Sequence, residues 1–211
     1  MKLPAEIFRT YDIRGIVGRT LTAPIVRDIG RALGSLARER GSFGREFSAP
    51  TFAVCRDGRL SGPELLAALS DGLQAAGADV IDVGMAPTPI AYFAAVHLNC
   101  GSCVAVSGSH NPPDYNGLKM VVAGDTLYGD DIQALRTRIE RSDFKSGSGK
   151  RRETEVLSAY FGGRVYRTFK NGKCSELDMR ILSGFSKRPH YLFRKVLLDL
   201  FFFISRHGNL N

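Results

Sequence analysis

One short turn of the sequence, between two apolar segments, gathers three side chains that could take part in chemistry. The stretch Val104–Met120 reads VAVSGSHNPPDYNGLKM and contains Ser109, His110 and Lys119. Ser109 offers a hydroxyl nucleophile, and His110 can move a proton near neutral pH. Lys119 can act as a base or as a counter-charge to phosphate. These residue types together predict phosphoryl transfer, whereas the structural alternative is a turn serine, a turn-capping histidine and a solvated strand lysine.

The backbone of this turn is predicted to be stiff. Gly108 permits conformations that other residues avoid. Asn111-Pro112-Pro113 restricts the path out of the turn, because each proline limits its own φ and the residue before it. A serine held in this way would keep its reaction geometry. We expect the backbone N–H groups around Ser109 to converge on a phosphate.

A second candidate stretch lies near the N-terminus and reads FRTYDIRG, Phe8–Gly15. Arg9 and Arg14 bracket Tyr11 and Asp12, and an arginine fork is suited to binding phosphate through two hydrogen bonds. The alternative is a strand edge that carries a structural Arg–Asp pair.

The four cysteines do not suggest a disulfide framework. Cys100 and Cys103 enclose a Gly-Ser turn, and His97 precedes them, so that a metal or redox site is one interpretation. The other is two small buried residues beside a turn. A zinc site needs a second pair of ligands, and neither Cys55 nor Cys174 is spaced to supply it.

The elements that must position these residues alternate between strands and helices. Hydrophobic patterns predict strands at Thr51–Cys55, Ala78–Gly84, Cys103–Ser107 and Gly117–Gly124, and helices over residues 22–41, 61–76, 87–98 and 130–141. Thr22 is the expected N-cap of the first helix, and Ser61 with Glu64 has the spacing of a capping box. The pattern predicts an α/β domain of three layers, with a mixed, mostly parallel sheet between helices.

Charge is distributed unevenly along the chain. Residues 1–150 contain 17 Lys and Arg against 16 Asp and Glu, whereas residues 151–211 contain 12 against 5. The net charge of +8 therefore belongs almost entirely to the C-terminal part, and it does not indicate a nucleic-acid-binding domain. Residues 142–152 resemble a Gly/Ser/Lys linker, and we expect a poorly specified basic tail after it.

The tail contains one strongly apolar stretch, Tyr191–Gly208, which reads YLFRKVLLDLFFFISRHG. It could form a basic amphipathic helix on a partner or a membrane surface, or it could be an extension without an evolved fold. No apolar run reaches the roughly 18–20 residues of a membrane span, and the first residues are too polar for a signal peptide. A cytoplasmic protein is therefore expected.

Four motifs in the same order resemble one enzyme family. FRTYDIRG, CRDGRLSGPELL, DVGMAPTPI and SGSHNPPDYNGLKM are similar to the first domain of the bacterial phosphomannomutase/phosphoglucomutase family, the α-D-phosphohexomutases. The resemblance covers residues 3–161 and ends with LSAYF, Leu157–Phe161. Ser107 stands where the family commonly has Thr, and this change keeps the hydroxyl.

The resemblance implies specific roles. Family members interconvert hexose 1-phosphates and 6-phosphates through a bisphosphorylated intermediate. By motif, Ser109 would be the phosphoserine and, through its phosphate, one ligand of Mg²⁺. Lys119 would be a general base or acid, His110 and Arg14 would assist at the phosphoserine and the substrate, and Tyr11 would line the substrate approach.

The same resemblance implies that parts of the family's machinery are missing. The family's Asp-Gly-Asp-x-Asp-Arg metal loop and Gly-Glu-x-Ser-Gly-His sugar loop do not occur in this sequence. We expect a first domain over residues 1–145, a linker and the start of a second domain over residues 146–161, and an unrelated tail over residues 162–211. A frameshift or rearrangement would produce such a tail. The expected mutase would then be inactive alone, and the alternatives are a non-catalytic remnant or a binding module with a basic tail.

Overall fold

The structure is a computed structural model and describes residues 3–41 and 47–162. A short 3-10 helix, η1 (Ala5–Ile7), comes first. The strands are β1 (Ile13–Ile16), β2 (Thr51–Arg56), β3 (Asp79–Met85), β4 (Gly101–Val106), β5 (Tyr115–Val122), β6 (Asp125–Thr126) and β7 (Arg151–Glu153). The α-helices are α1 (Ala23–Arg40), α2 (Gly62–Ala75), α3 (Thr88–His97), α4 (Asp130–Glu140) and α5 (Leu157–Gly162). The tail from residue 163 onward, with its apolar stretch, lies outside the described residues.

The strands form one mixed sheet in the order β1-β5-β4-β2-β3-β7, and β6 pairs with β5. The pairs of β2 with β3 and β4, and of β3 with β7, are parallel. The pairs of β5 with β1, β4 and β6 are antiparallel. The predicted hairpin partner of β4 is therefore confirmed, although β5 begins at Tyr115, two residues earlier than expected.

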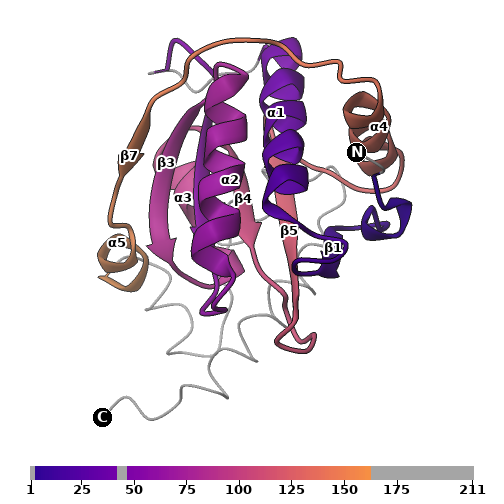
Figure 1. Cartoon of the computed structure of the whole chain (residues 1–211). Coiled ribbons are helices and arrows are strands. Elements are labelled where there is room, and N and C mark those ends of the chain that lie inside the picture. Colours follow the sequence, from indigo (N-terminus) through magenta and orange to yellow (C-terminus); the bar gives the residue numbers. More distant parts are fainter. Residues whose placement is uncertain (1–2, 42–46, 163–211) are drawn as a thin grey trace.

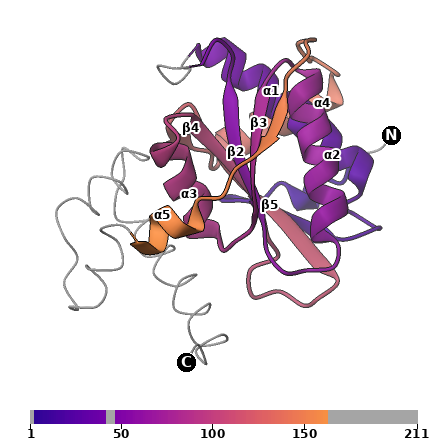
Figure 2. The ribbon, with the colours of Figure 1, turned by 90° about the vertical axis from the view of Figure 1, so that its left-hand side faces the viewer.

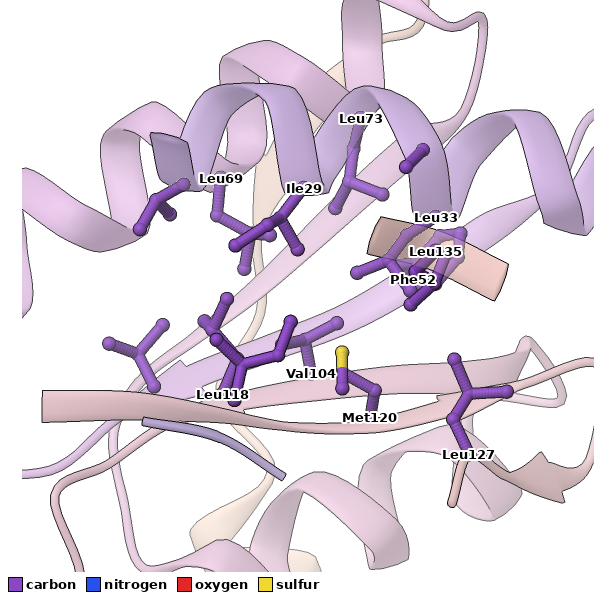
Figure 3. Packing of buried hydrophobic residues seen from close by; sticks show 14 of the residues in the cluster. Ile29, Leu33, Phe52, Leu69, Leu73, Val104, Leu118, Met120, Leu127 and Leu135 are labelled. Atoms are coloured by element: carbon purple, nitrogen blue, oxygen red, sulfur yellow. The ribbon is translucent and has the colours of Figure 1, made fainter. Parts of the chain in front are cut away.

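Helices cover both faces of the sheet, as the predicted three layers require. Figure 2 shows α1 and α2 on one face and α3 and α5 on the other. On the first face, Ile29 and Leu33 of α1 and Leu69 of α2 pack over Val104 and Leu118 (Figure 3). A second apolar cluster, which includes Ala53, Cys55, Ala91 and Val121, lies under α3. The part of the chain that the structure describes contains no helix capable of spanning a membrane.

Both predicted cap residues occupy the N-cap positions of their helices, but neither side chain makes the expected capping bond. Thr22 takes the N-cap position of α1, but its hydroxyl makes no capping bond and has no partner among the described residues. Ser61 adopts helical backbone angles of φ −75° and ψ −12°, so its side chain does not cap α2. Its Oγ instead accepts a hydrogen bond from Asn116 Nδ2 at 2.9 Å. Ser61 therefore ties the start of α2 to the start of β5.

The stretch predicted as a linker takes part in the sheet at its end. Residues 143–150 have no regular secondary structure, but Arg151–Glu153 form β7 beside β3. The backbone path also docks on α2, because Gln74 Nε2 donates to the Gly149 carbonyl at 3.0 Å. These residues therefore pack against the sheet domain instead of leaving it at Lys145.

Candidate active site

The loop between β4 and β5 lies at the end of the sheet where β2, β3 and β4 finish (Figure 1). Ser107 N donates to the Gly117 carbonyl at 2.9 Å, which closes the base of the loop. Loops at the carboxyl ends of parallel strands are the usual place for ligands in such sheets. The loop that the sequence singled out is therefore in a position to bind one.

Ser109 has a backbone conformation that serine rarely adopts. Its φ is +54°, in the left-handed region. This conformation costs a non-glycine residue about 1–2 kcal/mol, and such strain is concentrated at functional sites. The Ser109 N–H donates to Ser107 Oγ at 3.1 Å, and Ser109 Oγ lies 3.3 Å from Nδ1 of the exposed His110. The predicted serine and histidine are thus in hydrogen-bond range.

Two residues of the connection between β2 and α2 hold this loop through bonds from their side chains to its backbone. Asp57 Oδ2 accepts the Gly108 N–H at 3.1 Å. Arg59 donates to the carbonyls of Ser109 at 3.1 Å, Asn111 at 2.7 Å, Pro112 at 2.5 Å and Tyr115 at 2.9 Å. Sequence reasoning did not single out either residue, although both lie in the quoted motif CRDGRLSGPELL. Their loop-holding role depends on contacts between residues about fifty positions apart, which no local pattern reveals.

The prediction that the backbone N–H groups around Ser109 converge on a phosphate is wrong for three of these groups. The N–H of Gly108 is bonded to Asp57, that of Ser109 to Ser107, and that of Asn111 to the Gly108 carbonyl at 3.1 Å. These groups fold the loop and do not point together at an open phosphate position. Positive charge for an anion must come mainly from side chains.

Arg14 is one candidate side chain, and its guanidinium lies in a buried pair with the Asp12 carboxylate. The two side chains are 2.5 Å apart and almost fully buried, which confirms the predicted Arg–Asp pair. Arg14 Nε is buried and has no hydrogen-bond partner among the described residues. Register places Arg14 opposite Gly117, where a Cβ would overlap the Ile13 carbonyl oxygen. A glycine at position 117 therefore lets β1 bring Arg14 close to the base of the loop.

Lys119 supplies a second buried charge on the same face. Lys119 pairs with Ala105 of β4 and lies two positions after Gly117 on β5. Because side chains alternate between the two faces of a strand, positions 117 and 119 face the same way. Arg14, which pairs with Gly117, therefore shares that face. Only 3% of Lys119 is exposed, so the alternative of a solvated strand lysine is wrong. Burying a cation is costly, and proteins retain one where an interaction compensates for it.

Tyr11 and Arg9 lie on the short segment before β1. Tyr11 is 45% exposed and Arg9 is exposed. The register brings Arg14 and Lys119 to the base of the Ser109 loop, whereas Tyr11 lies outside the sheet at the surface. Arg9 does not share the burial of Arg14, so the two arginines do not form one buried fork.

The cysteines are packing residues in the described structure. Cys55, Cys100 and Cys103 are free and buried. Burial raises the pKa of Cys55 to about 12 and raises those of Cys100 and Cys103. His97 stacks on Phe93, with ring centroids 4.9 Å apart. Within residues 3–41 and 47–162, no group of three His, Cys, Asp or Glu side chains could hold a metal ion.

Comparison with known families identifies the domain. Residues 5–146 match the family model "Phosphoglucomutase/phosphomannomutase, alpha/beta/alpha domain I". The chain belongs to this family. Ser109, Arg14 and Lys119 all lie within the matched residues, and so do Asp57 and Arg59. The phosphohexomutase domain I therefore includes both the loop and the residues that hold it.

Curated relatives and a solved structure agree with this assignment. The chain is 55% identical over 159 residues to a phosphomannomutase/phosphoglucomutase of Pseudomonas aeruginosa, which covers 75% of this chain and 33% of the relative. It is 47% identical over 157 residues to a phosphoglucomutase of Neisseria gonorrhoeae, covering 74% and 33%. A Burkholderia thailandensis family structure superimposes with a TM-score of 0.68 at 49% identity, covering 75% and 35%. The chain thus spans about a third of the length of these relatives.

Proposed function

We propose that this chain carries the phosphoserine domain of a hexose-phosphate mutase acting on mannose or glucose phosphates. The observation that carries the proposal is the strained Ser109, in a loop at the end of the sheet whose adjoining strands carry the buried Arg14 and Lys119. A serine that must offer its oxygen to phosphorus repeatedly needs a fixed backbone and nearby positive charge. Family membership supplies the reaction class, in which phosphate moves between O1 and O6 of a hexose.

In the proposed reaction, Ser109 Oγ carries the phosphoryl group. Transfer breaks the bond between Oγ and phosphorus and forms a bond between phosphorus and a sugar hydroxyl oxygen. The sugar hydroxyl loses its proton to a base, and the departing Ser109 oxygen takes up a proton from an acid. Lys119 is the proposed base or acid, and Arg14 offsets the charge on the phosphoryl oxygens. His110, at hydrogen-bond distance from Oγ, assists there. Tyr11, exposed beside β1, would line the approach of the sugar.

Mg²⁺ is part of the proposal only through the family. The described residues fit a metal poorly, because they contain no group of three candidate ligands. Asp57, the carboxylate that bonds the loop, already accepts from Gly108 and from Arg59. Only the phosphate on Ser109 would provide a ligand here, and the remaining ligands would have to come from residues beyond this domain.

Turnover by this chain alone is proposed to be negligible. It spans about a third of its relatives' length, and its sequence contains neither the metal loop nor the sugar loop of the family. Positioning and charge stabilisation provide most of the catalysis in phosphoryl transfer, so an isolated domain lacks most of it. A cytoplasmic location and hexose phosphate ligands are proposed on the same family basis, with no nucleic-acid partner.

Intact-mass measurement tests the proposal. The chain is incubated for hours with glucose 1,6-bisphosphate and Mg²⁺, and we expect a mass increase of one phosphate, because one slow transfer to Ser109 needs no repeated turnover. Ser109→Ala should abolish the increase, while Ser158→Ala, at an exposed serine within α5, should keep it. A second assay couples glucose 6-phosphate formation from glucose 1-phosphate to a dehydrogenase. Phosphate uptake that survives in Ser109→Ala would contradict the carrier role, and rapid turnover would contradict the predicted inactivity.

A further inference from the structure

We propose that Arg59 and Asp57 are positioning residues that fix the backbone around Ser109 for phosphoryl transfer, and that Arg59 does not bind the substrate phosphate itself. This inference rests on the proposed function of Ser109. It concerns two residues outside the loop, on the connection between β2 and α2.

All five N–H donors of Arg59 are used inside the protein. Nε donates to Asp57 Oδ2 at 3.2 Å. One terminal nitrogen donates to the carbonyls of Pro112 and Tyr115, and the other to those of Ser109 and Asn111. A guanidinium has five N–H groups and no acceptor, so none remains for a substrate oxygen. Arg59 is therefore a framework cation of the loop and not an anion ligand.

Asp57 completes the arrangement on the other side of Ser109. Its Oδ1 accepts the Arg59 backbone N–H at 3.1 Å, and its Oδ2 accepts both Arg59 Nε and the Gly108 N–H. Its own backbone N–H donates to the Val106 carbonyl at 2.9 Å. The Ser107–Gly108 peptide, through its N–H, and the Ser109–His110 peptide, through its carbonyl, are thus both held by this ion pair.

The hydrogen bonds from Asp57 and Arg59 account for the unusual backbone conformation of Ser109. A φ of +54° is unfavourable for serine by about 1–2 kcal/mol and persists only where the surroundings enforce it. Hydrogen bonds with a charged partner contribute about 1.5–3 kcal/mol each, so the bonds from Asp57 and Arg59 are sufficient to hold it. Without them, we expect Ser109 to relax to a negative φ and its hydroxyl to leave its present position beside His110 Nδ1.

Lysine cannot replace Arg59 in this role. An ammonium has three donors around a single nitrogen, and it cannot span four carbonyls and a carboxylate that require a planar fork. Arg59→Lys therefore keeps the charge and removes the geometry. Asp57→Asn removes the charge and one acceptor position at a similar size.

Two measurements on the same variants test the inference. The first follows the rate of phosphate uptake by Ser109 as the concentration of glucose 1,6-bisphosphate is varied. For Arg59→Lys we expect the saturating rate to fall about a hundredfold, as for a reacting group misplaced by about 1 Å, with little change in the half-saturating concentration. Arg138→Lys is the matched control, because Arg138 also bonds a carboxylate, but its bonds join α4 to Glu39 in the last turn of α1 and not to the loop. Its uptake rate should equal that of wild type.

The second measurement is hydrogen exchange at the Gly108 amide, which does not depend on phosphate. Protection should fall at least tenfold in Arg59→Lys and Asp57→Asn, and it should be unchanged in Arg138→Lys. A raised half-saturating concentration with an unchanged saturating rate would show that Arg59 binds phosphate and would overturn the inference, as would unchanged protection. If wild type accepts no phosphate, the proposed function fails, and exchange still decides whether this pair fixes the loop.

Discussion

The Cα of Gly108 lies against the guanidinium group of Arg59, at a position where a Cβ would overlap Nε and Cζ. Gly108→Ala should therefore push the guanidinium out of its ring of carbonyls while leaving Arg59 in the sequence. We expect the free energy of unfolding to fall by about 1–3 kcal/mol, because buried polar groups lose their partners. Chemical denaturation measures this loss, and phosphate uptake by Ser109 should fall with it.

Gly58→Ala is the matched control for this prediction. A Cβ at Gly58 would lie 3.8 Å from Met85 Sδ, which is an ordinary contact. Gly58 lies between Asp57 and Arg59, so both variants alter the same neighbourhood. Equal losses of stability in the two variants would contradict the role assigned to the contact between Gly108 and Arg59.

Replacing Ser109 should reveal the strain in its backbone. Glycine adopts positive φ without steric penalty, whereas alanine bears the same penalty as serine. We expect Ser109→Gly to be about 1 kcal/mol more stable than Ser109→Ala, although neither can accept phosphate. Thermal unfolding of the two variants side by side measures the difference. An alanine variant as stable as the glycine variant would mean that the φ of +54° carries no strain.

The buried cysteines should resist alkylation in the folded protein. Iodoacetamide reacts with thiolates, and burial raises the pKa of Cys55 to about 12 and those of Cys100 and Cys103 in the same direction. At pH 8 we expect no labelling of these three residues within the time that labels a free cysteine fully, and full labelling in denaturant. Peptide mass mapping resolves each site. Fast labelling of Cys100 or Cys103 in the folded chain would restore the redox interpretation.

The pair of Glu39 and Arg138 should make stability depend on pH. Arg138 donates to both Glu39 oxygens, at 3.0 and 2.6 Å, and these bonds hold the pKa of Glu39 below its ordinary value of 4.5. A lowered folded-state pKa adds stability above pH 4.5, and this stability is lost as the pH falls through the folded-state value. Because Glu39 is partly exposed, Glu39→Gln should destabilise the chain at pH 7 by about 0.5 kcal/mol.

Denaturation of the Glu39→Gln variant across pH 3–7 checks this expectation. The difference from wild type should shrink toward zero at the acidic end of the range. Glu6→Gln, at an exposed residue of η1, serves as the control and should show no such trend. A Glu39→Gln penalty that persists at pH 3 would mean that the carboxylate charge is not its source.

Much of the fold was predictable because its signals are local. The apolar face of α1, the glycine that ends it at Gly41, and the buried strands β2 to β4 all follow from periodicity and from residues with restricted conformations. The caps were not predictable in the same way. Ser61 has the right spacing for a capping box, but Asn116 competes for its hydroxyl from a distant strand, and only the tertiary structure reveals that competitor.

The candidate site likewise contains residues that local sequence signals identify and residues that only tertiary contacts reveal. Ser109, His110 and Lys119 could be identified from residue types around one turn, and Arg14 from a short motif. The burial of Lys119 could not be predicted from the sequence. It follows from the register of β5 against β4 and from the packing of α3 on that face of the sheet. Asp57 and Arg59 were missed because their partners in the loop are backbone atoms, and the sequence does not show which backbone groups a side chain will meet.

β7 affects where this domain can be divided. Its residues pair with β3, and the flanking backbone extends the pairing through Val80 N to the Lys150 carbonyl and Thr154 N to the Asp82 carbonyl. A chain ending at Lys145 would leave one border of β3 with unsatisfied donors and acceptors, which is a template for self-association. A version carried through Tyr160 would keep that border closed. We therefore expect residues 146–160, which contain β7, to decide whether the domain stays monodisperse or aggregates.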